Sequence, residues 1–302
     1  DGSGHCLVQK LAEKLGVNPG CIVLGNGSDE IIGMLTRALM APGDEAIMTE
    51  PSFLMYEIMV QSVGARPIFV PLKSLFVDLD GILEQITDKT RIIFLNNPNN
   101  PTGTIITKSA FDAFIARVPE DVVVVIDEAY IEFAKDADCL NGLPYCTGER
   151  PIVVLRTFSK AYGLAGIRIG YGVMPGELAG FLHRVRQPFN ANALAQAGAC
   201  AALADDAFLE KTVNLVRGEL EFLYAGLEAL GAHCFPSEAN FFLVDVDGDA
   251  DAFFEAMLRE GVIVRSMASY GYPRYIRINA GTREDNKRFL NAFAKVMNRL
   301  KE

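Results

Sequence analysis

A lysine, two hydroxyls and an arginine lie close together in the middle of the chain. Thr157-Phe158-Ser159-Lys160 follows an apolar run at 152–155, and Arg168 lies eight residues beyond Lys160. Lysine is the side chain that forms imines with carbonyl compounds once its pKa is lowered. Two hydroxyls and an arginine can hold a dianionic phosphate. A single loop lysine is ordinarily just solvated, so it is the cluster that indicates chemistry.

A carboxylate stands at the end of a second apolar run. Asp127-Glu128-Ala129-Tyr130 follows residues 122–126. Burying a carboxylate is costly unless it has a charged or hydrogen-bonding partner, and a cationic ring nitrogen would be one such partner. The alternative is an aspartate that caps the following helix, and the sequence leaves both interpretations open.

Two turns have the composition of ligand-binding loops. Gly25-Asn26-Gly27-Ser28-Asp29-Glu30 leads into an apolar helix, where free N–H groups would face an anion. The alternative is an ordinary helix cap by Ser28 or Asp29. The stretch from Asn96 to Gly103 holds two prolines and is a rigid turn in which Asn100 offers an amide, unless it is loop chemistry only.

Two arginines flank a loop rich in glycine and proline near the C-terminus. Arg265 and Arg277 lie on either side of Ser269-Tyr270-Gly271-Tyr272-Pro273. Guanidinium groups bind carboxylate or phosphate with two parallel hydrogen bonds. Arg277 sits in an apolar run and needs an anionic partner if it is buried. An internal ion pair is the alternative.

Strand and helix patterns alternate over the first two thirds of the chain. Strands are predicted at 46–49, 65–70, 91–95, 122–126, 152–155 and 167–173, with helices at 29–40 and 108–117 among others. The run 122–126 is apolar throughout, as expected for a strand buried on both faces. The alternation predicts an α/β fold with a mostly parallel sheet, in which ligands lie beyond the carboxyl ends of strands.

The last third has a different pattern. Apolar residues recur every three or four positions from Val213 to Leu230, which predicts a long helix closed by Gly231. Further strands are predicted at 241–244, 262–265 and 275–278, with helices at 251–260 and at the C-terminus. Thr282 and Asp285 resemble a capping box for the last helix. We therefore predict a large domain over 1–204 and a smaller α+β domain over 205–302.

Composition narrows the class of protein. The 302 residues are half hydrophobic and carry a net charge of −10, which argues against nucleic acid or membrane as the partner. Six scattered cysteines without a C-x-x-C pair, and three histidines far apart, argue against a metal site and indicate reduced thiols in the cytoplasm. No apolar run approaches the ~20 residues of a membrane span, and no signal peptide is visible.

The ordered motifs resemble a known family. Gly-Asn-Gly-Ser-Asp-Glu, Asn-Asn-Pro-Thr-Gly, Asp-Glu-Ala-Tyr and the stretch from Thr157 to Arg168 resemble fold-type I aminotransferases that depend on pyridoxal 5′-phosphate (PLP). The likeness is closest to histidinol-phosphate aminotransferases and runs from Gly25 to the Arg-Ile-Asn-Ala-Gly that begins at Arg277. It implies a PLP-transferase-like fold, a homodimer with sites at the interface, and a small-molecule amino donor and 2-oxo acid as reactants.

The resemblance also implies a role for each site residue. Lys160 would hold the cofactor as a Schiff base and then move the proton between the substrate α-carbon and the cofactor C4′. Asp127 would pair with the pyridinium nitrogen. The other cofactor contacts would be Asn100 and Tyr130 to the ring 3-oxygen, Phe53 stacked on the ring, and Ser28, Asp29, Thr157, Ser159 and Arg168 around the phosphate. On the substrate side, Arg277 would bind the α-carboxylate, Arg265 the substrate phosphate, and Asn240 would help to position the reactants.

Several interpretations stay open beside this one. The same scaffold could serve an aromatic or other amino-acid aminotransferase, a lyase of the threonine-phosphate decarboxylase type, or a ligand-binding regulatory domain without activity. Arg265 separates the first of these from histidinol phosphate, because its charge would otherwise need another partner. The chain also begins without Met, at an Asp1-Gly2 that resembles the end of the family's Pro-Asp-Gly stretch. We therefore expect a preceding segment, with a tyrosine that reaches the cofactor phosphate of the neighbouring subunit, to be missing and activity to be impaired.

Overall fold

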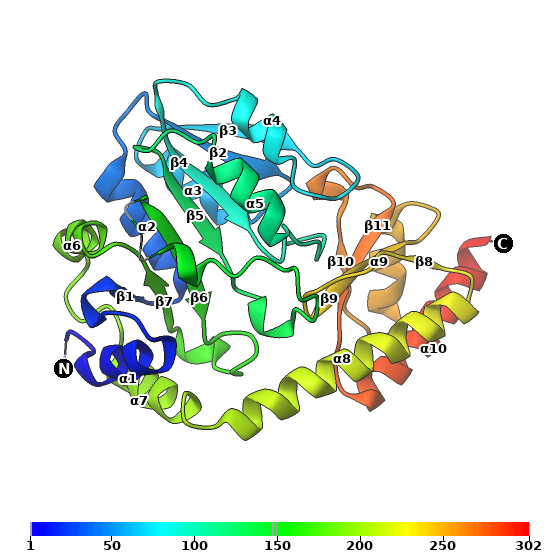
Figure 1. Ribbon diagram of the computed structural model, residues 1–302. Coiled ribbons are helices and arrows are strands. Elements are labelled where there is room, and N and C mark those ends of the chain that lie inside the picture. Colours follow the sequence, from blue (N-terminus) through cyan, green and yellow to red (C-terminus); the bar gives the residue numbers. More distant parts are fainter. Residues whose placement is uncertain (1, 147, 149, 302) are drawn as a thin grey trace.

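The computed structural model describes residues 2–146, 148 and 150–301 (Figure 1). Its larger sheet has seven strands in the order β1-β7-β6-β5-β4-β2-β3. They are β1 (Ile22–Gly25), β2 (Glu45–Glu50), β3 (Arg66–Pro71), β4 (Thr90–Asn96), β5 (Val123–Asp127), β6 (Ile152–Thr157) and β7 (Gly170–Val173). Neighbouring strands from β3 to β6 are parallel, and β7 is antiparallel to both β6 and β1. The predicted α/β fold with a mostly parallel sheet is confirmed.

Helices cover both faces of this sheet. Side chains alternate between the faces along each strand, so Val123 and Val125 of β5 lie on one side and Val124 and Ile126 on the other. The first side packs against α2 (Ser28–Leu39), α3 (Met55–Ser62) and α6 (Gly176–Val185). The second packs against α1 (His5–Leu15), α4 (Leu79–Glu84), α5 (Lys108–Ile115) and α7 (Ala193–Ala202). By the same alternation, Asp127 at the end of β5 belongs to the side of α2 and α3.

A second sheet of four antiparallel strands follows, in the order β10-β11-β9-β8 (Figure 1, yellow to orange). Its strands are β8 (His233–Cys234), β9 (Phe241–Asp245), β10 (Arg265–Ser266) and β11 (Tyr275–Asn279), and they pack with α8 (Asp206–Ala229), α9 (Ala250–Arg259) and α10 (Arg283–Lys301). The capping box before α10 is confirmed. The Thr282 hydroxyl accepts from the Asp285 N–H at 3.3 Å, and the Asp285 carboxylate accepts from the Thr282 N–H at 3.3 Å.

The long helix α8 joins the two parts. Its Val213 packs in a cluster with Tyr130 and Phe241, while Leu220, Leu223 and Leu227 pack in the core of the smaller sheet. The helix ends before Gly231, whose φ of 74° is the left-handed conformation expected of a C-terminal glycine. We propose residue 204 as the boundary between the two domains, because it falls between α7, which packs on the large sheet, and α8.

Two predicted strands need correction. The strand predicted at 262–265 is largely wrong, since β10 covers only Arg265–Ser266. The N–H of Val262 donates to the carbonyl of Met257 at 3.0 Å, so this residue closes the turn that follows α9, and Ile263 is 83% exposed. The strand predicted at 167–173 begins only at Gly170, because Ala165–Ile167 form a 3-10 turn and Arg168 has a φ of 59°.

Other elements were absent from the prediction, among them β1 and the helices α1, α3, α4, α6 and α7. β1 has only four residues, and α3 and α4 have one or two turns each, so their patterns are short. Within the part of the chain that the structure describes, none of the helices combines the length and the apolar character that a membrane crossing needs.

Candidate active site

Every residue that the sequence analysis assigned to cofactor binding lines a single cavity of about 260 Å³. The cavity lies beyond the carboxyl ends of β4, β5 and β6, where a parallel sheet places its ligands. Its lining consists of Ser28, Asp29, Phe53, Asn96, Asn100, Asp127, Ala129, Tyr130, Thr157, Ser159, Lys160 and Arg168. Of these, Asn96 and Ala129 are the two for which the sequence analysis gave no role.

The start of α2 forms one wall of the cavity. The residue that precedes the helix is Gly27, with a φ of 78° and no side-chain cap, so the interpretation of Ser28 or Asp29 as the capping side chain is wrong. Both residues instead lie in the first turn, whose N–H groups have no partner within the helix. A Cβ on Gly27 would lie 2.3 Å from Nη2 of Arg168, so any larger residue here would have to displace the guanidinium.

Arg168 completes this end of the cavity. Its Nη1 lies 3.4 Å from the hydroxyl of Ser159, and its Nη2 lies 3.3 Å from a carboxylate oxygen of Asp29. The hydroxyl of Thr157 accepts from the N–H of Ser159 at 3.0 Å. A guanidinium, two hydroxyls and the positive end of a helix therefore surround one place, which suits a phosphate.

Asp127 lies at the floor of the cavity and is 3% exposed. One carboxylate oxygen accepts from the hydroxyl of Tyr56 at 2.8 Å, and the other accepts from the N–H of Ala129 at 3.2 Å. The next element is a 3-10 turn that begins after Tyr130, so the alternative of an aspartate that caps a helix is wrong. Burial raises the pKa of Asp127 to about 6 despite the Tyr56 hydrogen bond, which lowers it.

Lys160 opens into the same cavity. Its Nζ lies 5.2 Å from the centroid of the Tyr130 ring. Desolvation by the surrounding protein lowers the pKa of Lys160, and the positive charge of Arg277 lowers it further. A lysine with a lowered pKa has a larger fraction of free amine, which is the form that reacts with a carbonyl. Burial raises the pKa of Tyr130 to about 12, so its hydroxyl stays protonated near neutral pH and is available as a donor.

Two residues of this region were missed from the sequence. Tyr56 has no exposed surface and contacts Asp127 directly, as described above. Asn96 donates from its side chain to the carbonyl of Asp127 at 3.1 Å and accepts from the N–H of Asn100 at 2.6 Å. Asn96 could have been found by the rule that singled out Asp127, because it also ends a buried strand. Tyr56 had no such signal.

Arg265 and Arg277 lie side by side on adjacent strands of the smaller sheet. They are partners in the register of β10 with β11, and Arg277 donates to the amide oxygen of Asn100 in the large domain. The Arg277 guanidinium lies 4.8 Å from the ring centroid of Phe241, and its buried Nε has no hydrogen-bond partner in the part of the chain that the structure describes. Neither arginine has an ion pair with any described residue, so the alternative of an internal ion pair is wrong for the chain that the structure describes.

The two arginines line larger cavities outside the cofactor cavity. Arg265 is exposed and lines two larger cavities, of about 680 and 490 Å³. Arg277 lines the first of these, while Phe53 lines both the second and the cofactor cavity. Asn240 is not among the residues around these three cavities. Its side-chain oxygen is buried without a hydrogen-bond partner, and its carbonyl accepts from the N–H of Ala280 at 3.0 Å.

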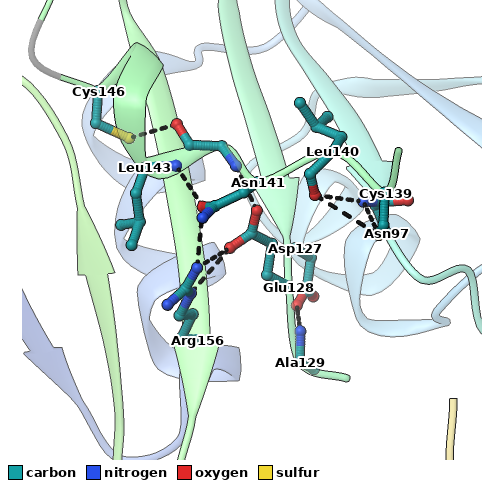
Figure 2. A network of polar contacts seen from close by, with 11 residues as sticks. Asn97, Asp127, Glu128, Ala129, Cys139, Leu140, Asn141, Leu143, Cys146 and Arg156 are labelled. Carbon is teal, nitrogen blue, oxygen red and sulfur yellow. Dashed lines mark hydrogen bonds and ion pairs between the residues drawn. The ribbon is translucent and has the colours of Figure 1, made fainter. Parts of the chain in front are cut away.

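A polar network lies behind the cavity floor (Figure 2). Glu128 is fully buried and lies 2.8 Å from the guanidinium of Arg156 on β6. Its other oxygen accepts from the N–H of Gly142 at 2.5 Å, and Arg156 donates to Asn141 at 3.2 Å. Figure 2 shows these groups on the opposite side of the chain from Asp127. The network joins the ends of β5 and β6 to the 141–143 loop and so fixes the backbone that carries Asp127.

The donor set fits PLP. A reactive lysine, a buried carboxylate without a cationic partner of its own and an anion site of hydroxyls and guanidinium match its carbonyl, ring nitrogen and phosphate. The Nε of Arg277, which has no partner among the described residues, adds a buried donor next to Asn100 of the cavity lining.

Comparisons with known proteins agree with this chemistry. The sequence model of the family Aminotransferase class I and II matches residues 3–293. The chain is 46% identical to a histidinol-phosphate aminotransferase of Desulfotalea psychrophila, over 99% of this chain and 80% of that protein. It is also 46% identical to histidinol-phosphate aminotransferase 2 of Pseudomonas fluorescens, over 99% of this chain and 81% of that protein.

A solved structure is similar as well. The crystal structure of histidinol-phosphate aminotransferase from Sinorhizobium meliloti in complex with pyridoxal 5′-phosphate superposes with a TM-score of 0.91 and 29% identity. The match covers 99% of this chain and 83% of that one. Sequence and structure together show that this chain belongs to the class I and II aminotransferase family of PLP-dependent enzymes, together with relatives named histidinol-phosphate aminotransferases.

Proposed function

We propose that this enzyme transfers an amino group from L-histidinol phosphate to 2-oxoglutarate, giving imidazole acetol phosphate and glutamate, in histidine biosynthesis. The observation that carries the proposal is the pair Arg265 and Arg277, which are partners on adjacent strands and have no carboxylate partner among the described residues. The charge of Arg277 also lowers the pKa of Lys160, after desolvation, which is the larger cause. The relatives that share 46% identity are named for this substrate.

The chemistry of the cofactor is electron withdrawal from the carbon that bears the amino group. The protein must hold the cofactor and move protons. We assign Lys160 to attach the cofactor, and its Nζ carries the proton between the substrate α-carbon and the cofactor C4′. Asp127 holds the ring nitrogen in its protonated state. Tyr130 and Asn100 donate hydrogen bonds to the ring oxygen, and Phe53 covers one face of the ring.

Anion recognition explains how one site serves both half-reactions. The amine substrate carries a phosphate, and glutamate carries carboxylates, so each arrives as an anion. Arg277, which is half buried beside Asn100, binds the α-carboxylate of the amino acid. Arg265, which is exposed and lines the cavity that shares Phe53 with the cofactor cavity, binds the phosphate of histidinol phosphate. Asn240 helps to orient the reactants from the start of β9. At the other end, Ser28, Asp29, Thr157, Ser159 and Arg168 hold the cofactor phosphate.

We also propose that the enzyme acts as a homodimer in the cytoplasm. The six cysteines are free thiols in the structure, which suits a reducing compartment. The dimer is proposed by analogy with PLP enzymes of this fold, in which sites lie at the subunit interface. Light scattering of the purified protein would test the dimer, and a mass equal to one chain would contradict it.

The test of the function is a visible-absorbance titration of the PLP-loaded protein with L-histidinol phosphate. A change in the cofactor band that 2-oxoglutarate reverses would establish both substrates. A change with aromatic amino acids alone would favour an aminotransferase of that class, and release of carbon dioxide would reveal a lyase. A cofactor band that no amine changes would favour a binding domain.

A further inference from the structure

Tyr56 lies below the cofactor cavity and does not line it. It belongs to α3, has no exposed surface, and donates its hydroxyl to a carboxylate oxygen of Asp127 at 2.8 Å. None of the motifs that identify the site includes it. Because Asp127 receives the Ala129 N–H on its other oxygen, Tyr56 supplies the only side-chain hydrogen bond that this carboxylate makes within the described residues.

The position of the Tyr56 ring is tightly determined. It stacks on Phe94 of β4 with centroids 4.7 Å apart and an interplanar angle of 7°. It also meets the ring of Phe53 edge-on, with centroids 5.6 Å apart and an angle of 84°. Phe94 lies on the same face of the sheet as Asp127, so strand, helix and carboxylate meet at one point. A ring held on two sides fixes the direction in which its hydroxyl points.

The charges around Asp127 explain why this hydrogen bond matters. The negative charge of Asp29 on α2 raises the pKa of Asp127, and the positive charge of Lys160 lowers the pKa of Asp127. The charge of Asp127 in turn helps burial to raise the pKa of Tyr130. Desolvation is the largest effect and favours the neutral acid. Burial holds the pKa of Tyr56 well above its ordinary value, so its hydroxyl remains a donor throughout the working range of pH. The Tyr56 hydroxyl therefore stabilises the ionised form of Asp127 and opposes the effect of burial, which favours the neutral acid.

We propose that Tyr56 is a positioning residue that orients the Asp127 carboxylate toward the cofactor ring nitrogen and keeps it ionised. This inference rests on the proposed assignment of Asp127 to that nitrogen. Tyr56 itself does not touch the cofactor. The competing interpretation is a core tyrosine whose hydroxyl found a convenient acceptor. That role would affect the free energy of unfolding and would leave cofactor binding as it is.

The experiment compares Tyr56→Phe with a matched control, Tyr145→Phe. Tyr145 also donates to an aspartate, Asp112 at 2.5 Å, but on the surface and outside the site. Both variants keep the ring, so the stack of residue 56 on Phe94 and the contact of residue 145 with Phe111 are retained and folding is expected. Apoprotein is prepared from each, its thermal unfolding is recorded, and PLP is titrated by visible absorbance at a series of pH values. Asp127→Asn is measured in parallel.

The expected result is a PLP dissociation constant about 10-fold higher in Tyr56→Phe, because this variant loses one buried hydrogen bond to a charged group. The pH below which PLP affinity falls should also move upward, because the carboxyl is then protonated at higher pH. Tyr145→Phe should match the parent protein in both respects. The unfolding temperatures of the two variants are compared with that of the parent protein. This comparison separates an effect on PLP binding from a change in protein stability.

Two outcomes would overturn the inference. If Asp127→Asn weakens PLP binding and Tyr56→Phe leaves both the dissociation constant and its pH dependence unchanged, Tyr56 is a core residue and the assignment of Asp127 stands. If Asp127→Asn also binds PLP like the parent protein, the assignment of Asp127 fails and the inference fails with it.

Discussion

The guanidinium of Arg277, on β11 of the smaller sheet, contacts the amide oxygen of Asn100, in the turn that follows β4 of the larger sheet. Arg277 is thus held by a neutral oxygen, with no carboxylate of the described chain beside it. A substrate carboxylate that reaches this place gains a charged partner without breaking an ion pair first. The absence of an internal anion is what makes the arginine available.

The first prediction fills that gap. Asn100→Asp would place a carboxylate beside Arg277 and should raise the KM for glutamate about 10-fold, because the new ion pair competes with the substrate. Asn141→Asp is the control, since Asn141 contacts Arg156 in the same way away from the cavity. Steady-state kinetics would check this, and an unchanged KM in Asn100→Asp would remove Arg277 from carboxylate binding.

The second prediction concerns Lys160. Lys160→Ala should abolish the visible absorbance of protein-attached PLP and lower the rate by more than about 1,000-fold, while the fold survives because the side chain opens into a cavity. Absorbance after gel filtration and circular dichroism would measure the two effects. Retention of the same cofactor band would mean that another group attaches the cofactor.

Arg265 carries the third prediction. Arg265→Ala should reduce kcat/KM for histidinol phosphate by about 100-fold and that for glutamate by less, because only the first substrate carries a phosphate. Arg274→Ala serves as the control, since Arg274 is a nearby arginine of the same domain that is paired with Asp245 and Asp247. Equal losses with both substrates would contradict the assignment.

Gly27 allows a test of the phosphate site by shape alone. Gly27→Ala would bring a methyl group to 2.3 Å from Nη2 of Arg168 and should weaken PLP binding about 10-fold or more by displacing the guanidinium. Gly43→Ala controls for backbone strain, because Gly43 also has a positive φ but nothing within 4 Å of the added atom. If both variants bind PLP equally well, Arg168 is not held where the phosphate lies.

The fifth prediction is a pH dependence of apoprotein stability. Burial raises the pKa of Asp127 from 3.8 to about 6. The protonated Asp127 therefore makes its whole contribution to the free energy of unfolding below about pH 4, and this contribution is lost as the pH rises through about 6. Asp127→Asn avoids this loss and should be more stable than the parent apoprotein by about 3 kcal/mol at about pH 8, from roughly 1.4 kcal/mol per pKa unit. Urea unfolding across this range would measure the difference. A parent apoprotein of equal or greater stability at about pH 8 would contradict it.

The sequence predicted the positions around the cavity because strand ends are readable. Asp127 and Lys160 follow apolar runs that belong to neighbouring parallel strands, so topology alone brings them together. The glycine turn before α2 was found for a different reason, because a Gly-rich stretch leads into an apolar helix, although the capping residue was misassigned. The resemblance to a family supplied the individual roles, which residue types alone left open.

Tyr56 shows what could not be predicted. Its helix has only eight residues, and its meeting with Asp127 depends on the face to which Asp127 points at the end of β5. That direction follows from the register of the whole sheet, which no local pattern contains. The same limit applies to β10, where the turn that follows α9 occupies the start of an apolar stretch that resembles a strand.

Helix α8 has a consequence for any attempt to divide the chain. The helix runs along both domains in Figure 1, and its first turns pack near Tyr130 while its last turns pack in the smaller core. Arg217, near its middle, donates to the carbonyls of Phe133 and Ala134 in the large domain. A cut at residue 204 would therefore leave the apolar side chains of the first turns of α8 exposed in the C-terminal fragment. In the N-terminal fragment it would expose the ring of Tyr130 to solvent. Because α8 contributes side chains to the packing of both parts, we expect neither part to be stable without the other.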